Sequence, residues 1–436
     1  MTRVVIAGGG WAGLAAAAEL TRRGIPVLVL EAAPQLGGRA RSVEIWGQSL
    51  DNGQHLMIGA YRGMLGLLRT LGVDEDAVFQ RLPLELRMES PHQGGYYLAT
   101  PRLPAPLHLL WGLIRASGLS LSERWQALRL AAGLSCRPAP AHDLPLAELL
   151  NHYGQSPQII RKLWEPLCLA MLNTPIDSAS SRVFRTVIRD TFARQRSDSD
   201  LLIPRADLDA VLPGPARGYI ERHGGEIRVG QRVTALQVDS ERIAGVVLAN
   251  GDTIAARHVV IATPDTVGRR LLEPHGSLKP IADALARLHH APICTVYLRY
   301  PPHVRLARPM CGLLDTTAQW VFDRRVSGNP GIMAVVISSH GPHMQLDNAE
   351  LAGHVARELA TLNPDWPEPE AARVIREKRA TLLCQAGIES RRPGNATPLL
   401  GCWLAGDYTA TGYPSVLEGA ISSGLACARL VAAEIL

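Results

Sequence analysis

Three glycines near the start of the chain have the spacing needed to hold a phosphate group against the backbone. Gly8, Gly10 and Gly13 follow a β-branched run at residues 3–7 and precede an alanine- and leucine-rich run at residues 14–23. The two runs predict a strand and a helix on either side of a glycine turn. In such a turn the first glycine allows the tight bend, the second lets the backbone approach a pyrophosphate, and the third lets helix and strand pack closely.

The residues beside this turn indicate which ligand it would hold. Trp11 and Ala12 begin the expected helix, whose unpaired N–H groups attract an anion. A second apolar strand at residues 27–30 ends in Glu31, which lies 18 positions after Gly13 and suits a ribose hydroxyl. An acidic residue here favours FAD or NAD over NADP. The alternative is a glycine-rich turn that binds nothing.

The next segment favours FAD by resemblance. Residues 34–41 resemble the glycine-glycine-arginine segment of the flavin amine oxidase and carotenoid desaturase superfamily. In that superfamily the segment lies along the FAD pyrophosphate, where glycine permits close approach and arginine suits phosphate. The resemblance implies that Gly38, Arg39 and Arg41 bind FAD. By residue type alone, both arginines could instead be solvated surface side chains.

Residues 225–248 predict strands joined by turns, followed by an apolar strand at residues 258–262. We interpret the whole run as an antiparallel excursion that returns to the main sheet. In the superfamily, the residue that matches Val233 contacts the adenine end of FAD through its backbone. By pattern alone, Val233 is an ordinary core residue of a strand.

A second group of candidate cofactor residues lies near the C-terminus. Gly406 allows backbone contact, and Asp407 can accept a hydrogen bond from a ribityl hydroxyl. A helix expected to start near Pro414, with Ser415 and Val416 close to its beginning, would direct its N-terminus at the flavin pyrimidine carbonyl. The same pattern could also be a plain helix start without a ligand.

The expected elements define a fold class. We predict an α/β protein in which a Rossmann-like FAD-binding domain is interleaved with an α+β substrate-binding domain. The discontinuous FAD-binding domain is expected at residues 1–60, 205–290 and 385–436, and the substrate-binding domain at residues 61–204 and 291–384.

Composition excludes several classes of protein. The 436 residues are 47% apolar and 19% charged with a formal net charge of +5, which is typical of a globular protein and not of a disordered or fibrous one. This charge is weak evidence for a polyanionic partner, so we expect no nucleic-acid binding. Seven cysteines, never closer than 17 positions, suggest a reducing compartment. The zinc-protease, P-loop and serine-hydrolase motifs are absent from the sequence, and no metal site is expected.

Two further segments suggest the activity by resemblance. Residues 51–61 and 163–175 resemble the paired signatures of the bacterial hydroxysqualene dehydroxylases, also described as squalene-associated FAD-dependent desaturases. The resemblance implies reductive dehydroxylation of hydroxysqualene to squalene in hopanoid biosynthesis, in which reduced flavin N5 gives a hydride to an allylic carbon after the hydroxyl is lost. The alternatives are an FAD-dependent desaturase or oxidase of a carotenoid or other polyprenoid, and a non-catalytic FAD-binding scaffold.

The catalytic candidates are one histidine and several aromatic residues. His55 could be the acid that assists loss of the hydroxyl, a residue that orients the flavin, or a structural histidine. Trp164, Trp320 and Tyr413 are candidate walls whose ring faces could stabilise a cation, although Trp164 also fits a plain core position. We expect FAD to be bound non-covalently, because no flavin-attachment motif is recognised. No second dinucleotide motif follows a convincing strand, so the electron donor is unidentified.

The apolar segment at residues 101–121 carries Trp111 between Arg102 and Arg115, and it predicts either a helix in the membrane interface or a buried helix of the substrate domain. A triterpenoid substrate favours contact with the membrane surface. The expected location is the cytoplasm, and peripheral contact at the inner face of the membrane is an option that the sequence leaves open.

Overall fold

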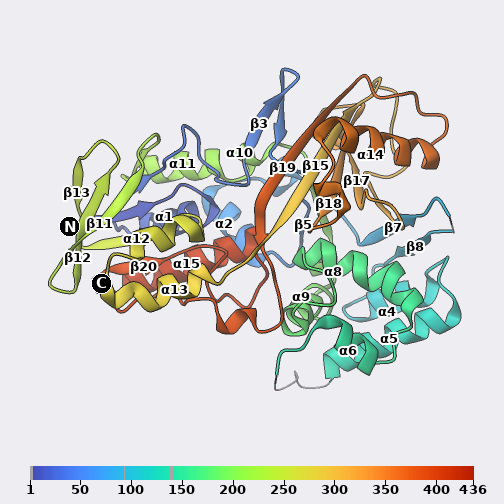
Figure 1. Cartoon of the computed structure of the whole chain (residues 1–436), viewed down its shortest axis with the longest axis horizontal. Coiled ribbons are helices and arrows are strands. Elements are labelled where there is room, and N and C mark those ends of the chain that lie inside the picture. The colour runs from blue at the N-terminus through green and yellow to red at the C-terminus, as the bar shows by residue number, and fades with distance from the viewer. Residues whose placement is uncertain (1–2, 93, 137–141) are drawn as a thin grey trace.

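The computed structural model describes residues 3–92, 94–136 and 142–436. One end of the molecule is built on a five-stranded parallel sheet in the order β10-β2-β1-β14-β20 (Figure 1). Its strands are β1 (Val4–Ala7), β2 (Val27–Leu30), β10 (Glu226–Arg228), β14 (His258–Ile261) and β20 (Cys402–Leu404). All of these strands except the edge strand β10 are buried along their whole length, as expected of apolar strands that are covered on both faces.

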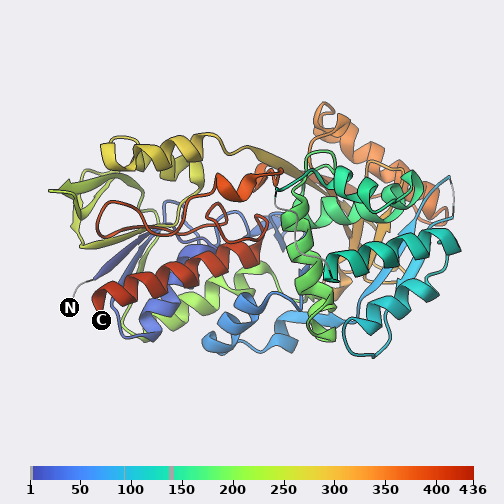
Figure 2. The same cartoon turned by 90° about the horizontal axis from the view of Figure 1, so that it is seen from below.

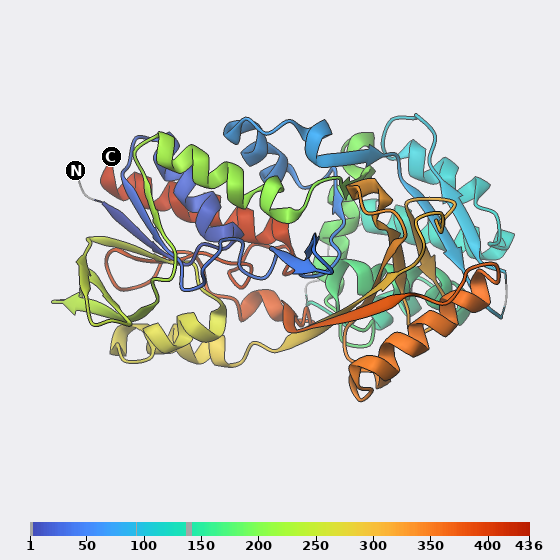
Figure 3. The ribbon, with the colours of Figure 1, turned by 90° about the horizontal axis from the view of Figure 1, so that it is seen from above.

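Helices cover this parallel sheet on one face and a small antiparallel sheet lies on the other side. Helix α1 (Trp11–Arg22) packs between α15 (Leu417–Ile435) and α11 (Pro213–Arg222). On the opposite side lie α12 (Asp265–Leu272) and α13 (Lys279–Ala286), as Figures 2 and 3 show. The small sheet beside them consists of β11 (Val233–Asp239), β12 (Arg242–Leu248) and β13 (Thr253–Ala255).

The other end of the molecule contains a seven-stranded sheet in the order β19-β15-β18-β17-β16-β7-β8. Its neighbouring strands are antiparallel, except that β16 and β7 are parallel. The strands are β7 (Glu85–Glu89), β8 (Tyr96–Ala99), β15 (His290–Arg299), β16 (Met310–Leu313), β17 (Trp320–Asp323), β18 (Ile332–Ser338) and β19 (Ala371–Leu382). The long strands β15 and β19 run from this sheet toward the parallel sheet (Figure 1).

Helices gather around the seven-stranded sheet. Helix α14 (Asn348–Leu362) packs on β15 and β19. Another group lies beside the sheet in Figure 1: α4 (Leu107–Arg115), α5 (Leu121–Cys136), α6 (Leu146–His152), α8 (Glu165–Leu172) and α9 (Ser181–Phe192). Within the described ranges, none of the helices combines the length and the hydropathy needed to cross a lipid bilayer.

Short elements connect the two ends. A hairpin is formed by β3 (Ser42–Ile45) and β4 (Gln48–Asp51), and a three-stranded sheet by β5 (Met57–Ile58), β9 (Leu201–Pro204) and β6 (Phe79–Leu82). Helices α2 (Arg62–Leu71), α3 (Glu75–Val78), α7 (Pro157–Ile159) and α10 (Leu208–Val211) complete the set of α-helices in the described residues.

The expected fold class is confirmed, since a parallel α/β unit drawn from three separate stretches is interleaved with a mixed α and β unit. The exact domain boundaries stay a prediction. The boundary expected at residue 60 separates helices that touch, because α2 packs against α15 and α11.

One expectation about the strands is wrong. The first strand of the run at residues 225–248, β10, pairs in parallel with β2 at the edge of the main sheet and is not part of the antiparallel excursion. Helix α11 precedes β10 and packs on α1, so the chain crosses over a helix before it returns to the sheet. A crossover of this kind produces a parallel neighbour.

Candidate functional site

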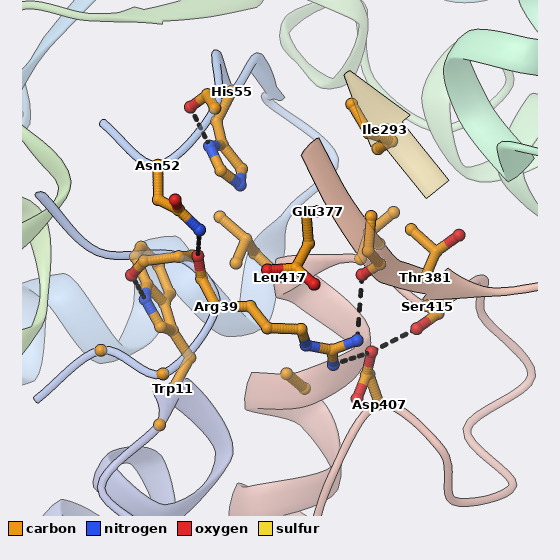
Figure 4. Close-up of a pocket in the computed structure, with 18 of the residues that line it drawn as sticks. Trp11, Arg39, Asn52, His55, Ile293, Glu377, Thr381, Asp407, Ser415 and Leu417 are labelled. Carbon is orange, nitrogen blue, oxygen red and sulfur yellow. Dashed lines mark hydrogen bonds and ion pairs between the residues drawn. The ribbon is translucent and has the colours of Figure 1, made fainter. Parts of the chain in front are cut away.

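A cavity of about 990 Å³ extends from the glycine turn between β1 and α1 to the strands of the seven-stranded sheet (Figure 4). Its volume lies at the upper end of the range of about 300–1,000 Å³ that is usual for ligand pockets. The elements that line it come from all parts of the chain, including β2, α8, β15, β19 and the start of α15. Most of the predicted site residues meet in this cavity.

The glycine turn shows which glycines the protein itself requires. Gly8 has a φ of +113°, and a Cβ on Gly13 would lie 2.0 Å from the Gly8 carbonyl oxygen, so both positions demand glycine for internal reasons. Gly10 is different, because its φ of −76° suits any residue and an added Cβ would approach only Gly38 Cα, at 4.0 Å. The space beside Gly10 faces the cavity and fits the close approach of a ligand to the backbone.

Helix α1 begins at Trp11, directly after Gly10, and no side chain caps its N-terminus. Trp11 and Ala12 line the cavity, and the Trp11 indole N–H donates to the Ala40 carbonyl at 2.8 Å. The ring therefore ties the helix start to the segment that holds Gly38 and Arg39. The uncapped N–H groups of the first turn can bind an anion such as a pyrophosphate.

Glu31 lies at the end of β2 and lines the cavity, as predicted from its spacing. Its two carboxylate oxygens accept hydrogen bonds from the backbone N–H groups of Gly9 and Ala33, each at 2.7 Å. An ionised carboxylate has about four acceptor sites, so ribose hydroxyls can still donate to it. Val233, at the start of β11, is 7% exposed and lines the cavity at the same end.

Arg39 connects the two predicted motifs. Its guanidinium group donates to Asp407 at 2.5 Å, and the Ser415 hydroxyl donates to the same carboxylate. Burial alone would raise the pKa of Asp407, but the Arg39 charge and the Ser415 hydrogen bond outweigh it and lower that pKa. The ionised Asp407 is therefore held in place at the cavity wall.

Arg39 also binds strand β19, which the sequence did not indicate. The guanidinium donates to the carbonyl oxygens of Arg379 at 3.1 Å and Ala380 at 2.9 Å. These carbonyls are free because β19 bulges where its pairing with β15 shifts register. Arg41 lines the cavity as well and donates to the Gly38 carbonyl at 2.6 Å. Arg39 is thus held by an ion pair and by the neighbouring strand, whereas Arg41 donates to a carbonyl within its own segment.

The C-terminal motif is arranged nearly as expected. Gly406 and Asp407 follow β20 and line the cavity, and a Cβ on Gly406 would lie 2.4 Å from the Tyr408 ring. Helix α15 begins at Leu417 and not at Pro414, because Val416 is extended and serves as an N-cap without a side-chain hydrogen bond. Ser415, Val416 and Leu417 line the cavity, so the positive end of the helix dipole faces it.

His55 lines the cavity, but its protonation state does not suit the expected role as an acid. Burial lowers the pKa of His55, against the opposing effect of Asp51, and the nearby Arg324 lowers it further. Its Nδ1 lies 2.9 Å from the Gly53 carbonyl, so the neutral ring carries its proton there and presents Nε2 as an acceptor. This state weighs against a proton donor and suits a group that accepts a hydrogen bond in the cavity (Figure 4).

A buried ion pair supports the loop that holds His55. Arg324 donates to Asp51 at 3.3 Å and to the Gln54 side chain at 2.7 Å, and Asp51 also accepts from the Leu208 backbone N–H at 2.8 Å. Sequence reasoning missed this group, because Arg324 is remote from the loop in the chain and belongs to no motif. Its only signal in the sequence is Asp51, which opens the segment at residues 51–61.

The aromatic candidates are divided by the structure. Trp320 and Tyr413 line the cavity. Trp164 is not among its lining residues: it is 5% exposed, donates from its indole N–H to Gln155 at 2.8 Å and packs edge-on against Phe184. Trp164 ends a π-helical turn, Ile160–Trp164, which directs its ring toward α9. The expectation that Trp164 forms a wall of the cavity is therefore wrong, and the core alternative is confirmed.

The end of the cavity beside the seven-stranded sheet is apolar. Its lining residues include Leu86, Leu167, Met171, Phe192, Met310 and Val336. These side chains come from β7, α8, α9, β16 and β18, which are distant in sequence. This region suits an apolar group, whereas the glycine turn and the start of α15 suit a polar, phosphate-containing group.

Helix α4 has one buried face and one exposed face, so it is not the fully buried helix that was one of the two alternatives for residues 101–121, and membrane contact stays a prediction. Leu113 is 3% exposed and packs in the core, whereas Trp111 is 49% exposed and Ile114 is 48% exposed. The apolar surface continues onto α5, where Leu121 is 80% exposed and Trp125 is 67% exposed. We call the exposed side chains of α4 and α5 the apolar patch; it consists of Leu107, Trp111, Ile114, Leu121 and Trp125.

The family described as flavin containing amine oxidoreductase matches residues 11–432. The hydroxysqualene dehydroxylase of Sinorhizobium fredii is 28% identical over 444 residues, which cover 99% of this chain and 98% of that protein. The hydroxysqualene dehydroxylase of Rhodopseudomonas palustris is 27% identical, with the same two coverages. The zeta-carotene desaturase of Zea mays is 26% identical over 97% of this chain and 82% of its own length.

Solved structures share the fold. An oxidoreductase from Methanosarcina mazei superposes with a TM-score of 0.76 at 17% identity, over 97% of this chain and 99% of that one. Cyclohexylamine oxidase from Brevibacterium oxydans superposes with a TM-score of 0.68 at 18% identity, over 100% of this chain and 99% of that one. At these identities the likeness concerns the fold.

Proposed function

The chain belongs to the flavin-containing amine oxidoreductase family and is a flavin-dependent oxidoreductase, and from this premise we propose that it is an FAD-dependent hydroxysqualene dehydroxylase. It would reduce hydroxysqualene to squalene in hopanoid biosynthesis. One observation carries the proposal: a single cavity joins a dinucleotide-type site to a region lined by apolar side chains, which suits a hydrocarbon. The names of its relatives point to polyprenoid substrates.

The cofactor proposed is FAD, held without a covalent bond. The space beside Gly10 and the uncapped start of α1 would receive the pyrophosphate, and Glu31 would accept from the adenosine ribose. Asp407 and the start of α15 would face the ribityl chain and the flavin ring. Among the described residues, no cysteine lines the cavity to form a thioether. Acid precipitation should therefore release all of the yellow colour, and colour kept in the pellet would contradict the non-covalent assignment.

The reaction can be balanced from the substrate. The allylic carbon–oxygen bond breaks with its electron pair on oxygen, and the oxygen takes up one proton from solution and leaves as water. When bound and reduced, the flavin supplies the hydride that forms the new carbon–hydrogen bond. The residues of the chain would hold the hydrocarbon in apolar surroundings that exclude bulk water from the cationic carbon.

His55, Trp320 and Tyr413 are assigned to the substrate. The neutral His55 would accept a hydrogen bond from the hydroxyl and orient it, while the aromatic rings would face the developing positive charge. Replacing His55 with Ala should lower turnover more than FAD occupancy, which flavin absorbance and product formation measure on one preparation. Normal turnover at full occupancy would return His55 to a structural role.

The direct test is product analysis. Enzyme reduced under argon should convert hydroxysqualene to squalene and become reoxidised, with the flavin absorbance as a second readout. The second candidate is oxidative desaturation of a carotenoid or other polyprenoid, which the similarity to a zeta-carotene desaturase favours. A desaturase substrate would instead bleach the oxidised enzyme. Absence of both responses would leave the non-catalytic FAD-binding scaffold.

Contact with a membrane surface is part of the proposal, since the substrate resides in the bilayer. A long hydrocarbon that crosses water costs about 0.8 kcal/mol per CH2, a barrier that an enzyme docked on the bilayer avoids. The apolar patch on α4 and α5 is flanked by Arg102 and Arg115, which suit anionic headgroups. We place the protein in the cytoplasm, in peripheral contact with the inner face of the membrane and reduced by a separate electron donor.

The patch allows a sharp test. Replacing Trp111 and Ile114 together with Asp should reduce binding to liposomes that contain anionic lipid, and reduce turnover of membrane-embedded substrate, while detergent-solubilised substrate is still converted. Leu400, which is 52% exposed and lies before β20, provides the control, because Leu400→Asp adds a charge outside the patch. Equal liposome binding by the double variant and the wild type would show that the apolar patch is not the membrane-binding surface.

A further inference from the structure

One acidic side chain in the cavity forms no ion pair with the residues that the structure describes. In the described part of the chain, three acidic residues line the cavity: Glu31, Glu377 and Asp407. The first accepts two backbone hydrogen bonds at 2.7 Å, and the third is paired with Arg39 and bonded to Ser415. Glu377 differs from both, because its carboxylate accepts only a long hydrogen bond of 3.3 Å from a backbone N–H of its own strand.

Glu377 is placed where the two ends of the cavity meet. It lies on β19 directly opposite Ile293 of β15, and both side chains line the cavity. Figure 4 shows its carboxylate extending from β19 into the space between Arg39 and Leu417, below His55. Leu417 begins α15, so the carboxylate lies beside the part of the cavity wall that is proposed to face the flavin.

The negative charge of Glu377 is only loosely matched by the protein. Glu377 is partly buried, and among the residues that the structure describes no basic side chain forms an ion pair with it. Against the effect of burial, the Asp407 charge and, to a smaller extent, the Glu377 charge raise the pKa of Arg39, but the Arg39 N–H groups donate to Asp407 and to two carbonyl oxygens. The Glu377 carboxylate therefore keeps acceptor sites that a positive group of a ligand in the cavity can face.

We infer that Glu377 is a catalytic residue whose carboxylate stabilises the positive charge that develops on the polyprenoid carbon. This inference rests on the proposed function and names the group that acts on the reacting atoms. A fixed negative charge of this kind stabilises a cationic transition state more than the neutral substrate. The role holds for hydride transfer in either direction, because both dehydroxylation and desaturation by hydride loss pass through positive charge on carbon.

The test measures binding, so it does not depend on turnover. The probes are a squalene-like trialkylammonium ion, whose nitrogen replaces the reacting carbon, and its uncharged isostere with carbon at that position. Each is titrated in detergent against the oxidised, flavin-loaded enzyme, and tryptophan fluorescence reports binding. Wild-type enzyme should bind the ammonium ion about tenfold more tightly than the isostere, as for loss of one charge-assisted contact.

The variants separate charge from shape. Glu377→Gln should abolish the preference for the ammonium ion and leave the affinity for the isostere unchanged, whereas Glu377→Asp should keep part of the preference. Glu368→Gln makes the same chemical change at an exposed position before β19 and should behave as wild type. The flavin absorbance spectrum checks that each variant is loaded.

Several results would overturn the inference. The first is the absence of a preference for the ammonium ion in the wild-type enzyme. This measurement uses no variant, so misfolding of a variant cannot explain it. The others are an unchanged preference in Glu377→Gln, or equal losses for both probes, which would mark a shape effect. Loss of flavin affinity with the preference intact would make Glu377 a cofactor ligand instead. Charge preference without squalene formation would contradict dehydroxylation but retain the cation site.

Discussion

The two ends of the cavity are built in different ways. At the glycine turn and the start of α15, the ligand-facing groups are backbone N–H groups and glycines whose positions follow from short stretches of chain. At the apolar end, the wall consists of side chains from five elements that meet only in the folded protein. The first end depends on backbone geometry, and the second on volume and hydropathy.

This difference predicts unequal tolerance to substitution. A methyl group added to Gly8 or Gly13 meets backbone atoms, which cannot move without disturbing β1 or α1. A methyl group removed from the apolar end leaves a void beside a flexible hydrocarbon, which can partly fill it. Substitutions at the glycine turn should therefore have larger effects than substitutions at the apolar end.

The largest effect is expected at Gly13. Gly13→Ala should lower the free energy of unfolding by about 3 kcal/mol or more, because its Cβ would lie 2.0 Å from the Gly8 carbonyl oxygen. Gly10→Ala is the matched variant: its Cβ has room in the protein, so folding should be kept while FAD affinity falls. Urea denaturation and FAD titration separate the two effects. Unchanged FAD affinity in Gly10→Ala would contradict the proposal that the pyrophosphate binds beside Gly10.

The next effect concerns pH. Glu418, in the first turn of α15, is 7% exposed, and burial raises its pKa to about 7 although Gly63 and Met64 donate to it. The folded protein thus holds this proton more tightly than the unfolded chain, whose value is near 4.5. Stability is fully present below about pH 4.5 and is lost as the pH rises through 7, by about 3 kcal/mol in total.

Glu418→Gln should flatten this dependence, as measured by urea denaturation between pH 5.5 and 8. The exposed Glu434 lies on the same helix, and Glu434→Gln should leave the slope unchanged. An unchanged slope in Glu418→Gln would show that the start of α15 carries no buried titrating charge.

A smaller effect is expected at the adenosine end. Glu31→Ala removes the proposed ribose partner and the acceptor for the Gly9 and Ala33 N–H groups, so FAD binding should weaken by about 1.5–3 kcal/mol. Turnover per bound FAD should not change, since Glu31 lies far from the reacting carbon. Isothermal titration with FAD and turnover at saturating FAD test both parts, and unaltered affinity would refute the ribose assignment.

The smallest effect is expected at the apolar end. Met171→Ala shortens a side chain that lines the cavity, and it should weaken substrate binding by about 1 kcal/mol without changing FAD affinity. Met333→Ala is the control, because Met333 is fully buried outside the cavity lining and should lower stability but not KM. The comparison between the two ends would be reversed if Met171→Ala lost more substrate-binding free energy than Gly10→Ala lost FAD-binding free energy.

The sequence alone determined the cofactor end. The strand, glycine turn and helix at residues 3–23, the acid at Glu31 and the C-terminal Gly406 and Asp407 were all predicted, and the structure brings them to one cavity. Such motifs depend on backbone conformations and helix starts within short stretches of chain, so local residue types specify them. The fold class followed from the order of the same elements.

Tertiary structure decided the rest. Trp164 was expected in the wall but faces the core, since the turn that ends at Trp164 directs the ring toward α9. Strand β10 joined the parallel sheet, and Arg324 reached Asp51 from a distant segment. Glu377 gained its place because a bulge in β19 and its pairing with β15 set which side chains face the cavity. Packing and strand register arise from contacts between distant segments, and a linear sequence pattern does not record them.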